Sequence, residues 1–217
     1  MRCMMTLFLL AISFQSWPEQ RLMVGDFSSG SLRGWEEKVF NGTTRYQIVE
    51  LAVNDKTTRV LRAESQASAS GRVREISIDL TKTPVLHWSW CVEKSLDNLD
   101  EQTKSGDDYA ARIYVVVSGG LAFWKTRSLN YVWASKMPVG SYWPNAYAKN
   151  NVIMVAQQSG HRNAGQWHRQ KTNIRDDFKR YFGKDIETID AVAIMTDTDD
   201  SGQHVTAWYG DIFFSAK

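Results

Sequence analysis

From residue 21 onward, short segments rich in apolar, β-branched and aromatic residues alternate with clusters of Gly, Asn, Asp and Ser. Apolar residues at alternate positions are typical of β-strands, and the four polar and small residue types are typical of the turns that join strands. The pattern therefore predicts a series of short strands, at residues 21–27, 44–51, 58–65, 72–79, 84–93, 109–118, 129–135, 151–158, 165–172, 187–196 and 205–215.

One segment, N-I-R-D-D-F-K-R-Y-F-G-K-D from residue 173 to residue 185, departs from this pattern. Asn173 is of a type that caps helix N-termini, and Asp176 follows three residues later, a spacing similar to a capping box. Gly183 stands where a glycine commonly ends a helix. The apolar residues between them recur at helical spacing and share one face: Ile174, Phe178, Tyr181 and Phe182. We expect one short helix near residues 174–182.

Many strands and a single helix indicate an all-β protein. So many antiparallel strands must hide their edges, and a sandwich of two sheets does so. The expected fold is a two-sheet antiparallel β-sandwich of jelly-roll type, concanavalin-like or galactose-binding-like. Because no repeat, linker or composition shift marks a boundary, residues 17–217 are expected to form a single domain.

Strand periodicity predicts which side chains share a face, because successive side chains of a strand point to opposite sides. In residues 84–93, Trp88 and Trp90 are expected in the core and His87 on the opposite face. In the last strand, residues 205–215, the core face is expected to carry three large apolar side chains: Trp208, Ile212 and Phe214.

The segment 109–117 has one wholly apolar face and one mixed face. Arg112 and Tyr114 lie on the mixed face, and Asp108 precedes them with the same parity. A charge on a central strand needs a partner or a solvated groove. Asp108 and Arg112 are four residues apart, about 13 Å in an extended chain, so they are not expected to pair with each other. Arg112 would meet a carboxylate from a neighbouring strand, or a ligand.

The N-terminus carries a short apolar run, residues 4–12, preceded by Arg2. This order is typical of a secretory signal, and the run is about half of the ~20 residues that a membrane-spanning helix needs. We expect residues 1–16 to be a signal peptide and the protein to be periplasmic or secreted, with no transmembrane segment after removal of the signal. A buried strand or short helix is the alternative. Cys91 would then be the only cysteine left, a buried small hydrophobe.

Charge and composition exclude some classes of function. The chain of 217 residues has 26 Lys and Arg against 24 Asp and Glu, so no nucleic-acid partner is expected. Nine Trp and an aromatic content of 12% are mainly a sign of a well-filled sandwich core. The sequence lacks a nucleophile elbow, an H-E-x-x-H motif, a phosphate loop and a dinucleotide fingerprint.

Five motifs in order resemble a family of bacterial proteins known as DUF3047: W-S-W at 88–90, G-D-D-Y-A-A-R-I-Y-V at 106–115, Y-V-W-A-S at 131–135, D-F-K-R-Y-F-G at 177–183 and T-D-T-D-D-S-G at 196–202. The resemblance covers most of the chain and implies no particular activity. D-F-S-S-G-S-L-R-G-W at 26–35 and W-Y-G-D-I-F-F at 208–214 are similar, more loosely, to the first and last strands of carbohydrate-binding jelly rolls. This second resemblance concerns the fold.

The segment T-D-T-D-D-S-G places three carboxylates on a turn that leaves a strand. Oxygen ligands at this spacing suit a hard cation, so Asp197, Asp199 and Asp200 are candidate ligands for Ca²⁺. No Glu follows at the position that the full calcium-loop signature requires. A solvated hairpin loop without metal is the alternative.

Three functions are consistent with these patterns. The first is a non-catalytic carbohydrate-binding module, in which aromatic planes and a few polar groups hold a glycan. Its candidate ligand-binding residues are His87, Asp108, Arg112, Tyr114 and Trp133. The second is a polysaccharide hydrolase or lyase that uses Asp108 with Asp197 or Asp199. The third is a structural or interaction protein of the bacterial envelope.

Overall fold

The structure is a computed structural model, and it describes residues 21–53, 56–122 and 125–217. The expected signal peptide, residues 1–16, lies outside the described residues. Within the described part of the chain, no helix is long and apolar enough to cross a membrane.

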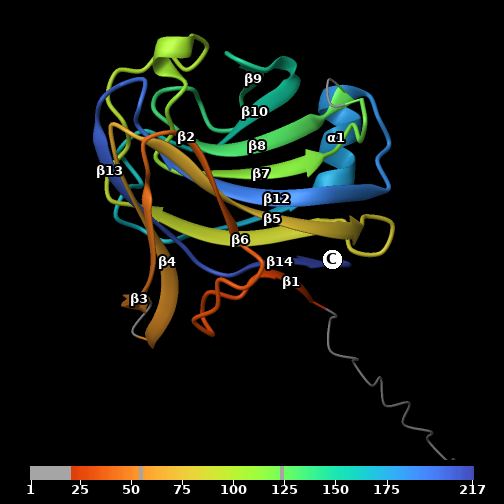
Figure 1. Cartoon of the computed structure of the whole chain (residues 1–217), viewed down its shortest axis with the longest axis horizontal. Coiled ribbons are helices and arrows are strands. Elements are labelled where there is room, and N and C mark those ends of the chain that lie inside the picture. Colours follow the sequence, from red (N-terminus) through yellow and green to blue (C-terminus); the bar gives the residue numbers. More distant parts are fainter. Residues whose placement is uncertain (1–20, 54–55, 123–124) are drawn as a thin grey trace, which may run out of the picture.

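Two sheets of seven strands each pack face to face (Figure 1). Sheet A has the order β1-β14-β6-β13-β4-β3, with β11 also paired to β6, and its strands are β1 (Leu22–Gly25), β3 (Arg45–Val53), β4 (Lys56–Gln66), β6 (Val85–Val92), β11 (His168–Asn173), β13 (His204–Tyr209) and β14 (Ile212–Ser215). Sheet B has the order β2-β5-β12-β7-β8-β10-β9, and its strands are β2 (Glu36–Asn41), β5 (Ala69–Asp79), β7 (Arg112–Val117), β8 (Arg127–Ala134), β9 (Tyr142–Asn145), β10 (Lys149–Ser159) and β12 (Thr188–Asp197).

The β-sandwich prediction is confirmed, with one difference in strand direction. All adjacent pairs are antiparallel except β8 and β10, which run parallel. The chain between these two strands contains β9, which pairs antiparallel with β10 and forms the sheet edge. A crossover of this length is what a parallel pair requires, because a tight hairpin can join only antiparallel neighbours.

The core between the sheets is filled by large aromatic side chains. Trp88 and Trp90 of β6 are buried, as their parity predicts, and their rings lie 5.5 Å apart in an edge-on arrangement. Trp88 contacts Tyr131 and Trp90 contacts Trp133, both from β8 of the opposite sheet. Much of the tryptophan content of the chain therefore serves packing.

The helix α1 (Ile174–Phe182) confirms the prediction from periodicity and capping. The side chain of Asn173 accepts a hydrogen bond from the backbone N–H of Asp176, and Gly183 ends the helix in the left-handed conformation, with φ of 66°. Ile174 and Phe178 are buried against the sandwich. A second, shorter helical turn is the 3₁₀ helix at Lys104–Gly106.

The predicted strand at residues 205–215 is wrong in one respect: it is two strands, β13 and β14, separated by Gly210 and Asp211. The break reverses the expected faces of β13 but not those of β14, where Ile212 and Phe214 are buried as predicted. Tyr209 is fully buried in the core, whereas Trp208, predicted as core, is only partly buried. Periodicity assumes an unbroken strand, so a two-residue interruption shifts the parity of one side against the other.

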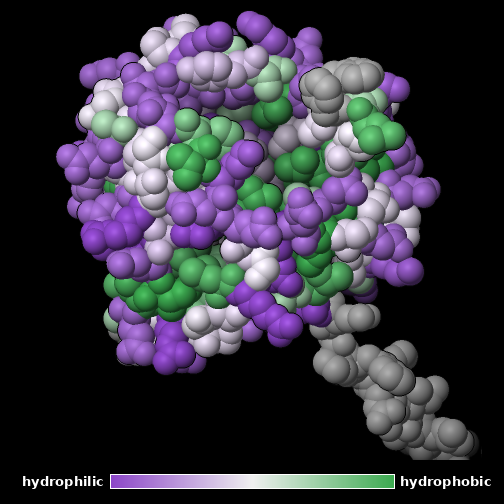
Figure 2. Space-filling model, in the orientation of Figure 1, coloured by the Kyte–Doolittle hydropathy of each residue, from purple (hydrophilic) through white to green (hydrophobic). Residues whose placement is uncertain are grey.

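Two edge strands, β2 and β9, have no counterpart in the predicted series. All six residues of β2 are exposed, so it has no buried face to create an apolar alternation. β9 has only four residues. Hydrophilic residues cover most of the face seen in Figure 2, and hydrophobic residues gather at its lower left, in the region of β3 and β4.

Candidate functional site

A pocket of about 450 Å³ lies on the outer side of sheet B, away from the core. In β7, Ile113 and Val115 face the core, and the alternate residues Arg112 and Tyr114 line this pocket. We call it the acidic pocket, because its charged lining residues are one arginine and four aspartates: Arg112, Asp107, Asp197, Asp199 and Asp200.

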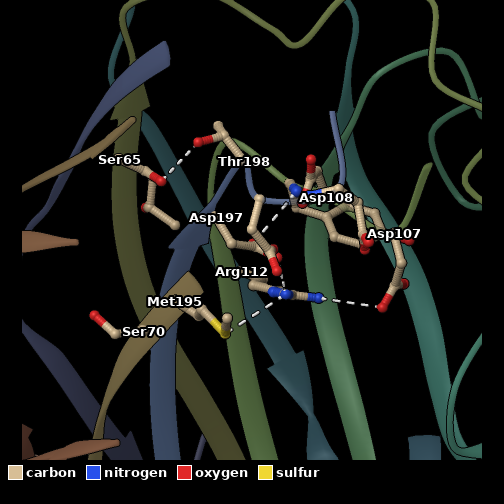
Figure 3. Close-up of polar contacts among 12 residues, drawn as sticks. Ser65, Ser70, Asp107, Asp108, Arg112, Met195, Asp197 and Thr198 are labelled. Atoms are coloured by element: carbon tan, nitrogen blue, oxygen red, sulfur yellow. Dashed lines mark hydrogen bonds and ion pairs between the residues drawn. The ribbon is translucent and has the colours of Figure 1, made fainter. Parts of the chain in front are cut away.

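The guanidinium of Arg112 lies at the base of the acidic pocket (Figure 3). One of its terminal nitrogens, Nη2, pairs closely with the carboxylate of Asp197 in β12, and Nη1 lies 4.0 Å from an oxygen of Asp107. The guanidinium carbon is 5.0 Å from the ring centre of Tyr109 and 5.5 Å from that of Tyr114. The buried Nε–H has no acceptor among the described residues.

Burial dominates the electrostatics of these groups. It raises the pKa of Asp197 well above the ordinary value, against the opposing effect of Arg112, and it raises the pKa of Asp107 in the same way. Burial alone would lower the pKa of Arg112, but the nearby Asp197 and Tyr114 raise it, so the guanidinium stays charged. A buried arginine surrounded by carboxylates whose pKa values are perturbed is typical both of structural ion pairs and of ligand sites.

A network of hydroxyl groups holds β12 against sheet A below the ion pair. The hydroxyl of Tyr209 donates to the carbonyl of Met195 at 2.8 Å and lies 2.8 Å from the hydroxyl of Thr196. Ser65 and Thr198, labelled in Figure 3, make a further hydroxyl contact of 2.8 Å between β4 and the end of β12. Every member is buried, so the network fixes the strand that carries Asp197.

A buried glutamate fixes the loop that precedes Asp107. The carboxylate of Glu101 is fully buried and accepts hydrogen bonds from the backbone N–H groups of Ser135, Lys136 and Met137. Burial raises the pKa of Glu101, and these backbone donors oppose that effect. Both carboxylate oxygens of Asp107 accept from the side-chain amide nitrogen of Asn145, at 2.8 and 2.9 Å.

The turn after β12 closes one end of the acidic pocket. Asp108 lies beneath this turn, where its carboxylate accepts the backbone N–H groups of Asp200 and Ser201, at 3.3 and 2.6 Å. Residues from both edges of sheet B contact this turn. The side-chain amide of Asn41 in β2 donates to Asp199, and the hydroxyl of Tyr147, just after β9, donates to Asp200.

The structure groups three carboxylates whose oxygens lie within 4.8 Å of one another: Asp108, Asp199 and Asp200. This group could hold a metal ion. It differs from the predicted set in one member, because Asp197 faces Arg112 and Asp108 takes its place. Sequence spacing groups residues of one turn, whereas Asp108 arrives from a segment about ninety positions away, as the separation of 93 residues from Ser201 shows.

The predicted ligand-binding residues fall in three places. Arg112 and Tyr114 line the acidic pocket, and Asp108 supports its turn from below. Trp133 is 1% exposed, and its ring packs in the core against Trp90 and His168, so it has no free surface at the pocket. His87 is on the outer side of sheet A, stacked on Phe213.

The two most exposed aromatic residues of the acidic pocket were not among the predicted residues. Phe40 is 65% exposed and Tyr147 is 52% exposed. Phe40 belongs to β2, which the periodicity does not reveal, and Tyr147 stands in the turn between β9 and β10. Their signal in the sequence is limited to an aromatic residue beside polar ones, in F-N-G and N-A-Y.

The two packed sheets define a β-sandwich with the jelly-roll fold of carbohydrate-binding modules. A family 30 carbohydrate-binding module of the cellulosomal cellulase Cel9D-Cel44B from Clostridium thermocellum has a TM-score of 0.50 at 10% identity, with 91% of this chain and 98% of the module aligned. The chain belongs to the DUF3047 family, described as "Protein of unknown function (DUF3047)", which matches residues 33–213. This confirms the family resemblance of its motifs.

Other solved structures align with the chain at lower similarity. The K1 cleaved adhesin domain of Lys-gingipain from Porphyromonas gingivalis has a TM-score of 0.45 at 12% identity, covering 91% of this chain and 99% of that domain. A variant of a family 29 carbohydrate-binding module in complex with cellulohexaose has a TM-score of 0.40 at 8% identity, covering 91% of each chain. A comparison with curated proteins found no match.

Proposed function

We propose that the protein is a non-catalytic glycan-binding module and that the acidic pocket holds one segment of an oligosaccharide. The observation that carries the proposal is the combination of two exposed aromatic rings, Phe40 and Tyr147, with buried polar groups at the base of one pocket. Aromatic planes cover the apolar faces of sugar rings, and fixed polar groups pair with hydroxyls. The volume of about 450 Å³ is within the ordinary range for small-ligand pockets.

The charge of the pocket favours a neutral glycan. Four aspartates surround it, and its one cation, Arg112, is already paired with Asp197. Carboxylate oxygens accept hydrogen bonds from sugar hydroxyls, but they repel a ligand that carries its own carboxylates. A neutral oligosaccharide therefore suits the acidic pocket better than a uronate chain does.

A hydrolase is the second candidate, because carboxylates gather here at a catalytic spacing. Oxygens of Asp108 and Asp199 lie within 4.8 Å, near the ~5 Å of retaining glycosidase pairs. Burial also raises the pKa of Asp108, as a general acid would need. Binding without catalysis is favoured because both oxygens of Asp108 already accept backbone N–H bonds of the turn.

A calcium ion at Asp108, Asp199 and Asp200 is a further part of the proposal. The three carboxylates offer oxygen ligands at short mutual distance, and Ca²⁺ prefers such ligands. The ion would hold the turn that closes the acidic pocket. A melting temperature that rises when CaCl₂ replaces EDTA, and that no longer responds in Asp199→Asn, is the expected result; no change in wild-type protein would contradict it.

The proposed location is the periplasm or the exterior of the cell, where polysaccharides are accessible. It rests on the charged and apolar order of residues 1–16. Fractionation of cells that produce the full chain is expected to find it outside the cytoplasm in a shortened form. An unshortened cytoplasmic protein would contradict this location.

Calorimetric titration with neutral hexasaccharides tests the binding function. Cellohexaose, mannohexaose and xylohexaose are the probes, and saturable binding of at least one is expected. Tyr147→Ala is expected to weaken that binding, and Tyr142→Ala is the matched control, since Tyr142 is 57% exposed and does not line the pocket. Equal effects of both variants would contradict the proposed site, and shortened saccharides after incubation would favour the hydrolase.

A further inference from the structure

A second hollow, of about 750 Å³, lies on sheet A where β13 ends and β14 begins. At this break the chain stays attached to β6 through one bond, from the N–H of Gly210 to the carbonyl of Ser89 at 2.9 Å. A Cβ at position 210 would lie 2.2 Å from the Ser89 hydroxyl, so a larger residue there would require the Ser89 side chain to move. Ser89 and His87 line the hollow from the side of β6 opposite the core.

The charge of this hollow is opposite to that of the acidic pocket. Its charged lining residues are three arginines and one aspartate: Arg21, Arg59, Arg169 and Asp211. The carboxylate of Asp211 is engaged by neutral donors of the chain, because it accepts hydrogen bonds from the backbone N–H and the hydroxyl of Ser28 at 2.8 and 2.6 Å. The three arginines still outnumber this one negative charge. We call this site the basic groove.

The arginines of the basic groove are held on the surface. Arg169 is exposed on β11, in register with Ser89 of β6. The guanidinium of Arg21 lies 4.8 Å from the ring centre of Phe213. Arg59 makes an exposed ion pair with Glu50 at 3.4 Å, a contact that water and salt weaken.

Aromatic rings line the same groove. The rings of His87 and Phe213 stack in parallel, with centres 4.6 Å apart and an angle of 6° between their planes. Trp167, partly exposed, is also a lining residue and lies beside Gly210. The groove thus combines flat rings with arginine side chains, whose planar fork pairs with carboxylate, phosphate or sulfate oxygens.

We propose that the basic groove is a second ligand site, and that it binds an anionic saccharide, with the arginines on its acidic groups and the partly exposed ring of Trp167 on a sugar ring. Arginines alone would suit any polyanion, whereas aromatic planes add a preference for a ligand with flat apolar faces. The site is separate from the acidic pocket: they lie on different sheets and share no lining residue.

Binding of oligogalacturonate, measured by calorimetry at low salt on the full chain, tests the proposal. Saturable binding is expected, and an excess of neutral cellohexaose should not displace the oligogalacturonate, because neutral glycans are assigned to the acidic pocket. Arg169→Ala is expected to weaken oligogalacturonate binding about tenfold, as the loss of one charged hydrogen bond does. Arg162→Ala is the matched control, an exposed arginine outside the groove, and should leave the affinity unchanged.

The proposal would be overturned by no binding of oligogalacturonate, by equal weakening in Arg162→Ala and Arg169→Ala, or by equally tight binding of single-stranded DNA of the same charge. The last would indicate general attraction of polyanions. Competition by inorganic phosphate at micromolar concentration would also overturn it, because the saccharide would then add nothing. Tyr147→Ala should leave this binding intact, so failure here is distinguishable from failure of the glycan proposal.

Discussion

The acidic pocket and the basic groove place charge on the sandwich in opposite ways. In the acidic pocket, Arg112 and Asp197 are buried and paired, and a hydroxyl network holds the strand that carries Asp197. In the basic groove, Arg169 and Arg59 are exposed on one face of sheet A. The charged pair of the acidic pocket therefore contributes to the stability of the fold and also lines the candidate site. In the basic groove, charge can be removed with little effect on folding.

The largest expected effect of this difference is on stability. Arg112→Met leaves the buried Asp197 without its cation, and such a loss typically costs about 3–5 kcal/mol in the free energy of unfolding. Arg169→Ala is expected to change it by less than about 0.5 kcal/mol, as for most surface substitutions. Urea denaturation measures both. Adding Asp197→Asn to Arg112→Met should restore part of the loss, and similar costs at Arg112 and Arg169 would refute the comparison.

Glu101 offers a second test, through pH. Glu101→Gln replaces one acceptor oxygen by an amide that faces backbone N–H groups, and we expect a loss of about 1–3 kcal/mol. Burial raises the pKa of Glu101 in the folded state. As pH rises, Glu101 therefore loses its proton in the unfolded chain before it does so in the folded one. The free energy of unfolding that the protonated group contributes at low pH declines accordingly.

Unfolding measured from pH 4 to pH 7 should therefore show a larger cost of Glu101→Gln at pH 4 than at pH 7. Exposed Glu36 of β2 supplies the control, because Glu36→Gln should cost little at either pH. A cost that grows toward neutral pH would show that the folded state favours the ionised form of Glu101.

An intermediate effect is expected on glycan affinity at the rim of the acidic pocket. Phe40 is 65% exposed, so Phe40→Ala removes a ring without opening the core. Loss of one stacking face should weaken binding of a neutral oligosaccharide about tenfold, or about 1.4 kcal/mol, with the melting temperature almost unchanged. Val39→Ala is the matched control, since Val39 is 53% exposed on the same strand and does not line the pocket. A fall in melting temperature with unchanged affinity would assign Phe40 to folding.

The smallest expected effect separates the sites by salt. Raising NaCl from about 0.05 M to 0.5 M shortens the screening length severalfold, so oligogalacturonate binding at the basic groove should weaken markedly. The affinity of the acidic pocket for a neutral glycan should change by less than about twofold, because that binding relies on hydrogen bonds and stacking and salt screens only charges. Titration at the two salt concentrations checks this. Equal salt sensitivity at the two sites would remove the distinction between them.

Much of the fold could be predicted from local pattern. The helix α1 follows from Asn173, Gly183 and a 3.6-residue apolar period, and the sandwich from repeated short strands. The edge strand β2 could not be predicted, because all its residues are exposed and no alternation results. The break at Gly210 and Asp211 lies where the chain passes close to Ser89, which is remote in the sequence.

Local sequence pattern identified only some of the residues at the two sites. Parity put Arg112 and Tyr114 on one face of β7, and both line the acidic pocket. Parity also puts Trp133 on the face of Tyr131, which is the core face, so its closeness to charged motifs in the sequence was misleading. For His87, periodicity identifies the outer side of a strand but not to which sheet the strand belongs. Partners such as Asp107 with Asn145 meet only through tertiary contacts.

The most direct test of two separate sites is a crossed titration. Wild type, Tyr147→Ala and Arg169→Ala are each titrated calorimetrically with the neutral hexasaccharide that binds and with oligogalacturonate. We predict that Tyr147→Ala weakens only the neutral ligand and that Arg169→Ala weakens only the acidic one, each about tenfold. Weakening of both ligands by the same single variant would contradict a molecule with one glycan site on each sheet.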